Sequence, residues 1–394
     1  MLNGISKNEC TGCAACLNIC PRKCITMKPD TSGFLFPEID DENCSKCGAC
    51  ERVCPLNSSV ENKGFFQQPK VFAAWSLDET VRLQSTSGGI FTELAKSVIE
   101  QGGYVVGARY NEAHLVEHYM IESIEDIAML RQSKYLQSEI GFIYRTIKEK
   151  LDKGQIVAFC GSPCQVASLL NVLGKNYDNL ITFDFICRGT NSPKAYSSYL
   201  AMLEKEYKSK IKRVWFKNKT YGWHRFSTRI EFENGEIYIK DRYSDLFILG
   251  YVRYNLYMRS CCFNCKYKTI PRIADLTLGD FWGIENNIPM EETEKGTSVI
   301  MVNSEKGNLI LESIKEKLFI EENKFENIIP ANKCILHSAE KNPESEAFLK
   351  MLDHAPFDKC YYQYTKISPV KKIKVKVKKY IKRIFKLLNI NGGL

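Results

Sequence analysis

Two cysteine runs near the N-terminus constrain this chain more than any other feature. The first reads Cys10-x2-Cys13-x2-Cys16-x3-Cys20-Pro21, and the second repeats the spacing as Cys44-x2-Cys47-x2-Cys50-x3-Cys54-Pro55. Three thiolates spaced in this way wrap one face of a metal cluster, and the fourth reaches across to a neighbouring cluster. We therefore assign Cys10, Cys13, Cys16 and Cys54 to one site, and Cys44, Cys47, Cys50 and Cys20 to a second.

The spacing also indicates the metal. It is the ligand pattern of bacterial ferredoxins that hold two 4Fe-4S clusters. Structural zinc usually takes two separated Cys-x2-Cys pairs, and disulfides need an oxidising compartment that nothing in the sequence supports. Cys24 lies outside both runs and is expected to be a small buried residue. We predict a two-cluster 4Fe-4S ferredoxin domain over residues 1–60.

Length and composition are those of a soluble globular protein with two or three domains. The chain has 394 residues, of which 44% are hydrophobic and 26% charged. No apolar segment precedes the first cysteine, and no stretch has 18 uninterrupted apolar residues, so we expect no signal peptide and no membrane span. Seventeen cysteines then indicate metal or redox chemistry in a reducing compartment, and we predict a cytoplasmic location.

The net charge of +9 comes from one end of the chain. Residues 371–386 contain nine Lys or Arg and no acid, so residues 1–370 hold 46 side chains of each sign. A formally neutral body argues against nucleic-acid binding. The tail, residues 371–394, has basic and apolar helical faces, so residues 371–390 could make a peripheral contact with the inner face of the membrane; a disordered, solvated tail is the alternative.

Hydrophobic patterns predict an α/β body with a mixed sheet after a polar linker. Its first part covers residues 70–154, its second part residues 155–330, and a C-terminal extension residues 331–370. Two apolar strands, 155–161 and 180–187, alternate with helices at 163–173 and 192–207, which favours a parallel sheet covered on both faces. Asn234-Gly235 predicts a type I′ hairpin turn. Ser123 with Asp126 predicts a capping box that opens a helix over 124–132.

Four cysteines outside the runs form a candidate third site. Cys164 opens the helix that follows the first of these strands, and Cys187 ends the second, so parallel strands would bring both thiols to one sheet edge. Cys262-x2-Cys265 lies far along the chain. From spacing alone, an iron–sulfur cluster, zinc and unconnected buried thiols all remain open. We expect Cys160, Cys334 and Cys360 to be structural, and Cys261 to point away from a site that its neighbour occupies.

Several stretches in order resemble a known family. They are SGGIFTELA, SKYLQS, CGSPCQVASLL, ICRG, SCCFNCKYK and ADLTLGDFWG. Together they resemble the beta subunits of coenzyme F-420 hydrogenases and dehydrogenases, in particular a bacterial branch in which a two-cluster ferredoxin precedes the flavoprotein body. The resemblance implies FAD and a third 4Fe-4S cluster near it, bound by Cys164, Cys187, Cys262 and Cys265. Many members have His where this chain has Arg188.

The resemblance also suggests where a flavin would bind. Ser85-Thr86-Ser87-Gly88-Gly89 precedes a helix whose N-terminus could hold a diphosphate, although a plain helix cap explains the same residues. We predict Ser85, Ser87, Gly88 and Gly89 as cofactor-binding residues, with Lys134 neutralising a phosphate and Trp282 stacking on the flavin. A solvated lysine and a core tryptophan are the alternatives. A group of aromatic and basic residues could line the entrance to a substrate site, or simply pack in the core. They are Trp215, Trp223, His224 and Arg225.

We therefore predict an iron–sulfur flavoprotein oxidoreductase. A ferredoxin-like donor or partner redox enzyme would load the N-terminal clusters, and electrons would pass through the third cluster to FAD and an unidentified substrate. No Gly-x-Gly-x-x-Gly follows a strand, and no catalytic side-chain constellation is evident. The alternative is a non-catalytic electron-transfer subunit that passes electrons to a partner enzyme. That enzyme could act in cell-surface polysaccharide biosynthesis, a setting that the resemblance suggests for some bacterial relatives.

Overall fold

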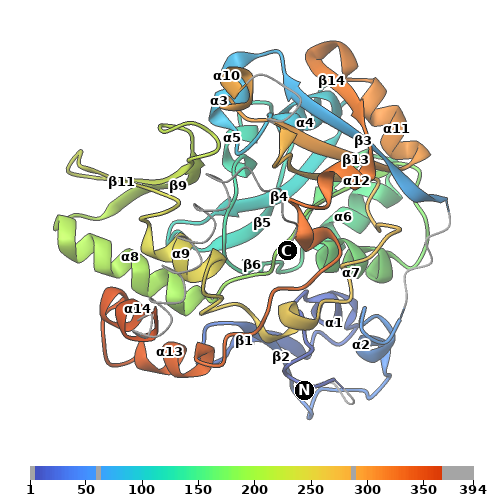
Figure 1. The fold of residues 1–394 in the computed structure, drawn as a ribbon. Coiled ribbons are helices and arrows are strands. Elements are labelled where there is room, and N and C mark those ends of the chain that lie inside the picture. The colour runs from blue at the N-terminus through green and yellow to red at the C-terminus, as the bar shows by residue number, and fades with distance from the viewer. Residues whose placement is uncertain (1–4, 59–63, 285–289, 366–394) are drawn as a thin grey trace, which may run out of the picture.

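The computed structural model describes residues 5–58, 64–284 and 290–365, and Figure 1 shows a small N-terminal unit packed beneath a larger body. The N-terminal unit consists of α1 (Ala15–Ile19), β1 (Ile25–Pro29), β2 (Leu35–Ile39) and α2 (Ala49–Arg52). Strands β1 and β2 pair antiparallel. Each helix carries the third cysteine of its run, Cys16 or Cys50, so the repeated sequence gives two equivalent turns around the predicted cluster sites. The unit is ferredoxin-like, as predicted.

A nine-stranded mixed sheet forms the centre of the body. Its order is β14 (Leu318–Asn323), β3 (Phe65–Ser76), β13 (Ser298–Ser304), β12 (Leu276–Asp280), β8 (Leu180–Phe185), β7 (Val157–Cys160), β4 (Tyr104–Tyr110), β5 (Val116–Ile121) and β6 (Ser138–Glu139). The neighbours β12, β8, β7 and β4 are parallel, while β3, β13 and β14 add antiparallel strands at one side. The predicted parallel pair is therefore β7 and β8, at the middle of the sheet.

Helices cover both faces of this sheet. The first half contributes α3 (Glu79–Gln84), α4 (Ile90–Glu100), α5 (Ile127–Leu130), α6 (Ile143–Asp152) and α7 (Pro163–Leu173). Val105 and Ala158 face a core with α4 and α11 (Glu305–Glu312), whereas Val106 and Phe159 face α6 and α7. This alternation along the strands explains why the central strands are apolar throughout.

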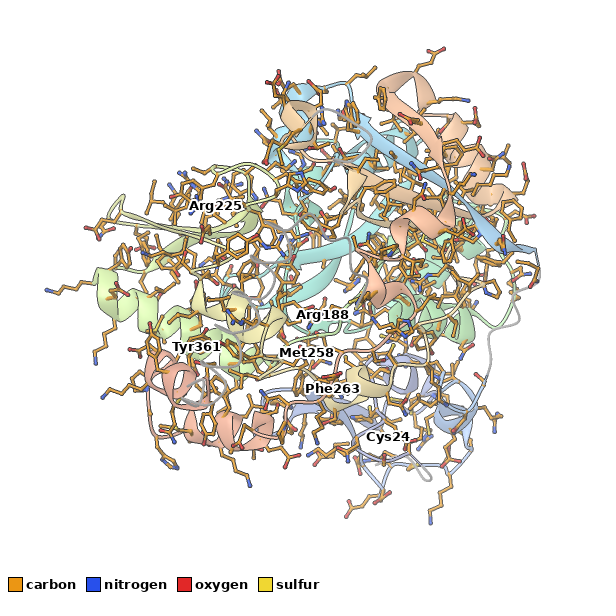
Figure 2. All side chains as sticks on the ribbon, in the orientation of Figure 1. Cys24, Arg188, Arg225, Met258, Phe263 and Tyr361 are labelled. Carbon is orange, nitrogen blue, oxygen red and sulfur yellow. The ribbon has the colours of Figure 1, made fainter. Side chains whose placement is uncertain are left out.

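A smaller sheet and an aromatic core form the other side of the body. Strands β9 (Ile211–Asn218), β10 (Ser227–Phe232) and β11 (Ile237–Asp241) pair antiparallel, and α8 (Pro193–Tyr207), α9 (Leu246–Val252), α13 (Ser345–Met351) and α14 (Phe357–Thr365) pack with them. Short elements complete the described chain: η1 (Ser260–Asn264), α10 (Met290–Thr293), η3 (Lys315–Lys317), α12 (Phe325–Ile328) and η4 (Lys333–Ile335). Figure 2 shows Tyr361 of α14 at this side, and Cys360 beside it is fully buried.

Two local predictions are wrong. Only Gly235 of the Asn234-Gly235 pair has a positive φ, so the β10–β11 connection is a longer turn with a left-handed glycine, closed by the Gly235 N–H donating to the Phe232 carbonyl at 3.1 Å. The helix expected over 124–132 shrinks to Ile127–Leu130 without a side-chain cap, because the Ser123 hydroxyl binds the Glu125 carboxylate instead. The predicted tail, residues 371–394, lies outside the described residues.

The N-terminal unit is joined to the body through a continuous apolar core. Ala14 and Leu17 of the unit share one buried cluster with Ile147 of α6 and Val166 of α7. Polar contacts reinforce it: the Arg145 guanidinium donates to the carbonyls of Asn18, Leu17 and Cys20 at 2.6, 3.0 and 2.8 Å. The ferredoxin-like unit is therefore fixed in one position on the body. No helix in the described part of the chain is long and apolar enough to cross a membrane.

A buried carboxylate, Asp275, ties three neighbouring strands together. One of its oxygens accepts from the Thr182 N–H and hydroxyl, both at 2.8 Å, and the other accepts from the Ser304 hydroxyl at 2.6 Å. We expect Asp275→Ala to lower the free energy of unfolding by about 3 kcal/mol, because it leaves buried donors on β8 and β13 without acceptors. Urea unfolding followed by circular dichroism measures the loss. Asp275→Asn keeps one acceptor oxygen and should lose less; equal losses would contradict this account.

Candidate active site and cluster-binding cysteines

The first cysteine set converges inside the N-terminal unit. Cys10, Cys13, Cys16 and Cys54 line one small hollow between α1, Pro37 and Pro55. Burial, together with the other thiols of the set, raises the pKa of the Cys16 thiol well above its usual value and that of Cys54 to about 11. Buried, mutually repelling thiolates require positive charge among them, which the iron of a cluster supplies. The donor set therefore fits the predicted cluster.

The second set lies closer to the surface. Cys47 is exposed, while Cys20 is buried and contributes to the environment of Cys50. Cys24 is 7% exposed, as expected, and its Sγ lies 3.4 Å from the Cys20 Sγ. Figure 2 places Cys24 within the N-terminal unit, away from the body. Of the two predicted clusters, the one with Cys20 and Cys47 is thus the nearer to solvent.

A large cavity lies where the parallel strands end. It has a volume of about 1070 Å³, and Cys160 of β7, Asp184 of β8 and Asp280 of β12 line it. Such a cavity at the carboxyl edge of parallel strands is the usual ligand site of an α/β sheet, and its size is sufficient for a dinucleotide cofactor. Cys13 lines both this cavity and the hollow of the first cysteine set, so the two sites adjoin.

The four scattered cysteines meet at this cavity. Cys164, Cys187, Cys262 and Cys265 all line it. The thiols of Cys187 and Cys265 contribute to the electrostatic environment of Cys164, and those of Cys262 and Cys265 to that of Cys187. Among the described residues, no group of three or more His, Cys, Asp or Glu side chains is suited to a single metal ion. Four thiols spread around a cavity fit a multi-atom cluster better than a lone zinc ion.

The backbone explains how Cys164 and Cys187 reach this position. A capping box of Ser162 and Gln165, followed by Pro163, starts α7 directly after β7 and places Cys164 in the first helical turn. Burial raises the pKa of the Cys187 thiol to about 12, and Lys268, which donates to the Cys187 carbonyl, opposes that increase. The prediction that Cys261 points away is wrong: it lines the same cavity and is hydrogen-bonded to the Cys262 thiol. The tight η1 turn keeps these neighbouring side chains together.

Most of the predicted flavin-binding residues line the same cavity. They are Ser85, Ser87, Gly89, Lys134 and Trp282. Thr86 links two of the loops, because its hydroxyl accepts from the Ser133 N–H at 2.9 Å. Gly88 is placed differently: a Cβ there would lie 2.4 Å from the Ala74 carbonyl oxygen, and its N–H donates to the Ser298 hydroxyl at 2.9 Å. Gly88 therefore allows the loop to pack closely on β3 and β13.

Lys134 and His118 are two buried titratable groups that line this cavity. The Lys134 ammonium donates to the carbonyls of Leu130, Arg131 and Gln132 at 3.3, 2.9 and 3.3 Å, and burial lowers its pKa to about 7. Burial also lowers the pKa of His118 to about 4, so the imidazole is neutral at pH 7. No motif indicated His118, whose ring nitrogens are hydrogen-bonded to the Ser138 hydroxyl and the Cys160 carbonyl across three strands.

Trp282 also lines the cavity. Its ring stacks on Trp223 at 4.4 Å, and Lys217 and Arg242 lie 5.0 and 5.2 Å from its centroid. Trp223 is fully buried and donates to Asp280 at 3.2 Å, which favours a packing role. Of the other residues predicted to line a substrate entrance, His224 lines the cavity. Arg225 instead pairs with Asp241 on the small sheet, and Figure 2 shows it away from Arg188.

Thiol sets joined to an α/β cavity define an iron–sulfur protein of the oxidoreductase class. Residues 71–142 and 154–328 match the N-terminal and C-terminal models of the coenzyme F420 hydrogenase/dehydrogenase beta subunit, and residues 9–58 match a 4Fe-4S dicluster domain. The chain belongs to the coenzyme F420 hydrogenase/dehydrogenase beta-subunit family.

Comparison with solved structures and with curated proteins adds two findings. The chain is similar to a chain of the F420-reducing [NiFe] hydrogenase complex from Methanosarcina barkeri, studied there by xenon derivatization. The two share 17% identity with a TM-score of 0.46, over 72% of this chain and 99% of that chain. No curated protein matches the sequence.

The third cysteine set can be tested by its iron content. We expect Cys164→Ala to reduce the iron of anaerobically purified protein from about twelve to about eight atoms per chain, because one cluster of four irons loses a ligand. Iron analysis with EPR of the reduced protein measures the change. Cys160→Ala is the matched control, since Cys160 lines the same cavity but lies outside the predicted set. Retention of about twelve irons in Cys164→Ala would contradict the assignment.

Proposed function

We propose that this chain is an iron–sulfur flavoprotein oxidoreductase in which one cavity holds FAD beside the third cluster. The observation that carries the proposal is the meeting, in a single cavity, of Cys164, Cys187, Cys262 and Cys265 with the Ser85–Gly89 loop. When bound, FAD would convert one-electron transfers into a two-electron reduction of a substrate. The residues of this chain bind and orient the groups and exclude water from them.

The placement of the cysteine sets supports a direction of electron entry. Cys47 of the second set is exposed, so an external donor such as a ferredoxin or a partner redox enzyme can approach that set. The first set lies between it and the cavity. Tyr267 occupies the boundary, because its environment includes Cys13 and Cys54 on one side and Cys164 and Cys265 on the other. We infer an electron path from the second set to the first and then to the third.

The charge of the cavity supports a negatively charged cofactor or substrate. Its described lining contains nine Lys or Arg and three acidic residues. Two of those acids are already paired, Asp184 with Arg272 at 2.7 Å and Asp280 with Lys217. The remaining positive charge attracts anions, and the diphosphate of FAD is one of them. The proposed membrane contact of residues 371–390 lies outside the described residues and stays a prediction.

One anaerobic preparation tests the proposed function. We expect about twelve irons, a similar amount of sulfide and about one extractable FAD per chain. Protein with about twelve irons but no flavin after reconstitution with FAD would instead support the alternative, an electron-transfer subunit that feeds a partner enzyme. Protein with zinc in place of iron would contradict both.

The buried lysine gives FAD binding a pH dependence. With its pKa at about 7, Lys134 is charged below pH 7 and becomes neutral above it. If its charge neutralises the diphosphate, FAD affinity should be highest below pH 7 and fall by up to about tenfold per pH unit above it. Equilibrium dialysis with FAD fluorescence between pH 6 and 9 measures this.

Lys134→Met provides the control for that dependence. The variant should bind FAD more weakly at pH 6 and show a flatter pH profile. If Lys134 only caps α5 through its three carbonyl contacts, the variant would keep the wild-type profile, and the proposed role in cofactor binding would be wrong.

A further inference from the structure

A buried arginine lies at the junction of the N-terminal unit and the cavity. Arg259 is 1% exposed and directly precedes η1, the turn that carries Cys262. Its Nε donates to the Cys10 carbonyl at 2.8 Å and one terminal nitrogen donates to the Leu35 carbonyl at 3.0 Å, so it contacts both halves of the ferredoxin-like unit. The Arg259 side chain therefore links the backbone of Cys10, in the first set, to the segment that carries Cys262 and Cys265, in the third set.

Gln137 completes the attachment. Its side-chain oxygen accepts from the other terminal nitrogen of Arg259 at 3.1 Å and from the Leu35 N–H at 2.8 Å, and its amide donates to the Gly12 carbonyl at 3.4 Å. Gly12 has φ +69°, and a Cβ there would lie 2.2 Å from Gln137 and 2.9 Å from Arg259. The loop between Cys10 and Cys13 is thus built around this pair, and only glycine fits.

Within the described part of the chain, no carboxylate pairs with the charge of Arg259. Its partners among the described residues are carbonyl and amide oxygens, the Cys10 thiol, and the rings of Phe34 and Phe36, whose centroids lie 5.2 and 4.1 Å away. A buried cation is costly unless negative charge lies near it. Once they hold clusters, the thiolates of Cys10 and Cys262 would provide that charge, because the Cys10 carbonyl accepts from the Arg259 guanidinium and the Cys262 N–H donates to the Arg259 carbonyl at 3.0 Å.

We propose that Arg259 is a shared positioning residue whose single positive charge raises the reduction potentials of the first and third clusters together. The inference rests on the proposed function, since it requires clusters at both cysteine sets. Reduction adds one electron to a cluster, and a fixed cation nearby stabilises the more negative reduced state. In the transfer between them, the first cluster loses one electron and the third gains one. Because the same charge acts on both, the driving force of that step is preserved while both clusters accept electrons more readily.

The test is a redox titration of the full-length holoprotein, monitored by EPR. We expect Arg259→Met to lower the potentials of the first and third clusters by at least about 59 mV, which is a tenfold change in a one-electron equilibrium. The second cluster should keep its potential, because Arg259 makes no contact with Cys20, Cys44, Cys47 or Cys50 among the described interactions. Arg259→Lys keeps the charge and should retain most of both potentials.

A matched control separates charge from attachment. Arg145 also donates to three carbonyls of the N-terminal unit, but it lies beside Cys20 rather than between the first and third sets. Arg145→Met should weaken attachment without lowering the two potentials. If Arg259→Met does not fold, Gln137→Glu gives a second measurement, because a carboxylate in that place neutralises Arg259 and should lower both potentials while leaving the arginine present.

The outcomes distinguish this proposal from the proposed function. A shift of only one cluster, equal shifts of all three, or no shift would each overturn the shared role of Arg259. A wild-type protein with about eight irons and no third cluster would instead show that the proposed function fails, and the shared role with it.

Discussion

The burial of cysteine thiols between two tightly packed parts of one chain is the constraint on which the rest of the structure depends. Leu17 of α1 shares a core with Ile147 of α6, so the ferredoxin-like unit is held against the body by packing. Burial raises the pKa of Cys16 and of Cys164 well above the usual value for a thiol. Thiolates are therefore unfavourable in this interior without metal, and clusters bound at these cysteines would contribute to folding.

The central sheet explains why distant cysteines can serve one site. Parallel pairing of β7 and β8 brings the end of one strand, followed by Cys164, beside the end of the next, followed by Cys187. The segment with Cys262 and Cys265 then approaches the same edge through η1. Because the Ser85–Gly89 loop precedes a helix on the opposite face of the sheet, the cofactor proposed at this edge would contact elements from both sides of the fold.

The features that depend on local sequence patterns, the N-terminal unit and the type of sheet, could be predicted from the sequence. The repeated cysteine spacing identified the N-terminal unit, and apolar strands alternating with helices identified the mixed sheet. The misjudged details depend on contacts that a local pattern does not contain. Gly88 was predicted to bind a cofactor, but its close approach to Ala74 explains the glycine. The alternative of a solvated Lys134 is wrong, because its ammonium donates to three carbonyls that no spacing reveals. Arg259 and Gln137 were missed because they contact residues more than a hundred positions away.

Two arginines near the third cysteine set carry a positive charge that does not change with pH, whereas a histidine in place of Arg188 would titrate. Arg188 follows Cys187 and is held by the Val252 carbonyl and the Asn255 side chain at 2.9 and 2.8 Å, close to the centre of the molecule in Figure 2. A histidine there would lose its charge near neutral pH, whereas a guanidinium keeps it. Arg188 directly follows Cys187, and Arg259 precedes the turn that carries Cys262, so the positive charge of both residues near the third set does not depend on pH near neutrality. In the proposed function, electron acceptance at this set would then depend on the donor and the clusters, whereas burial lowers the pKa of Lys134, at the proposed cofactor site, to about 7.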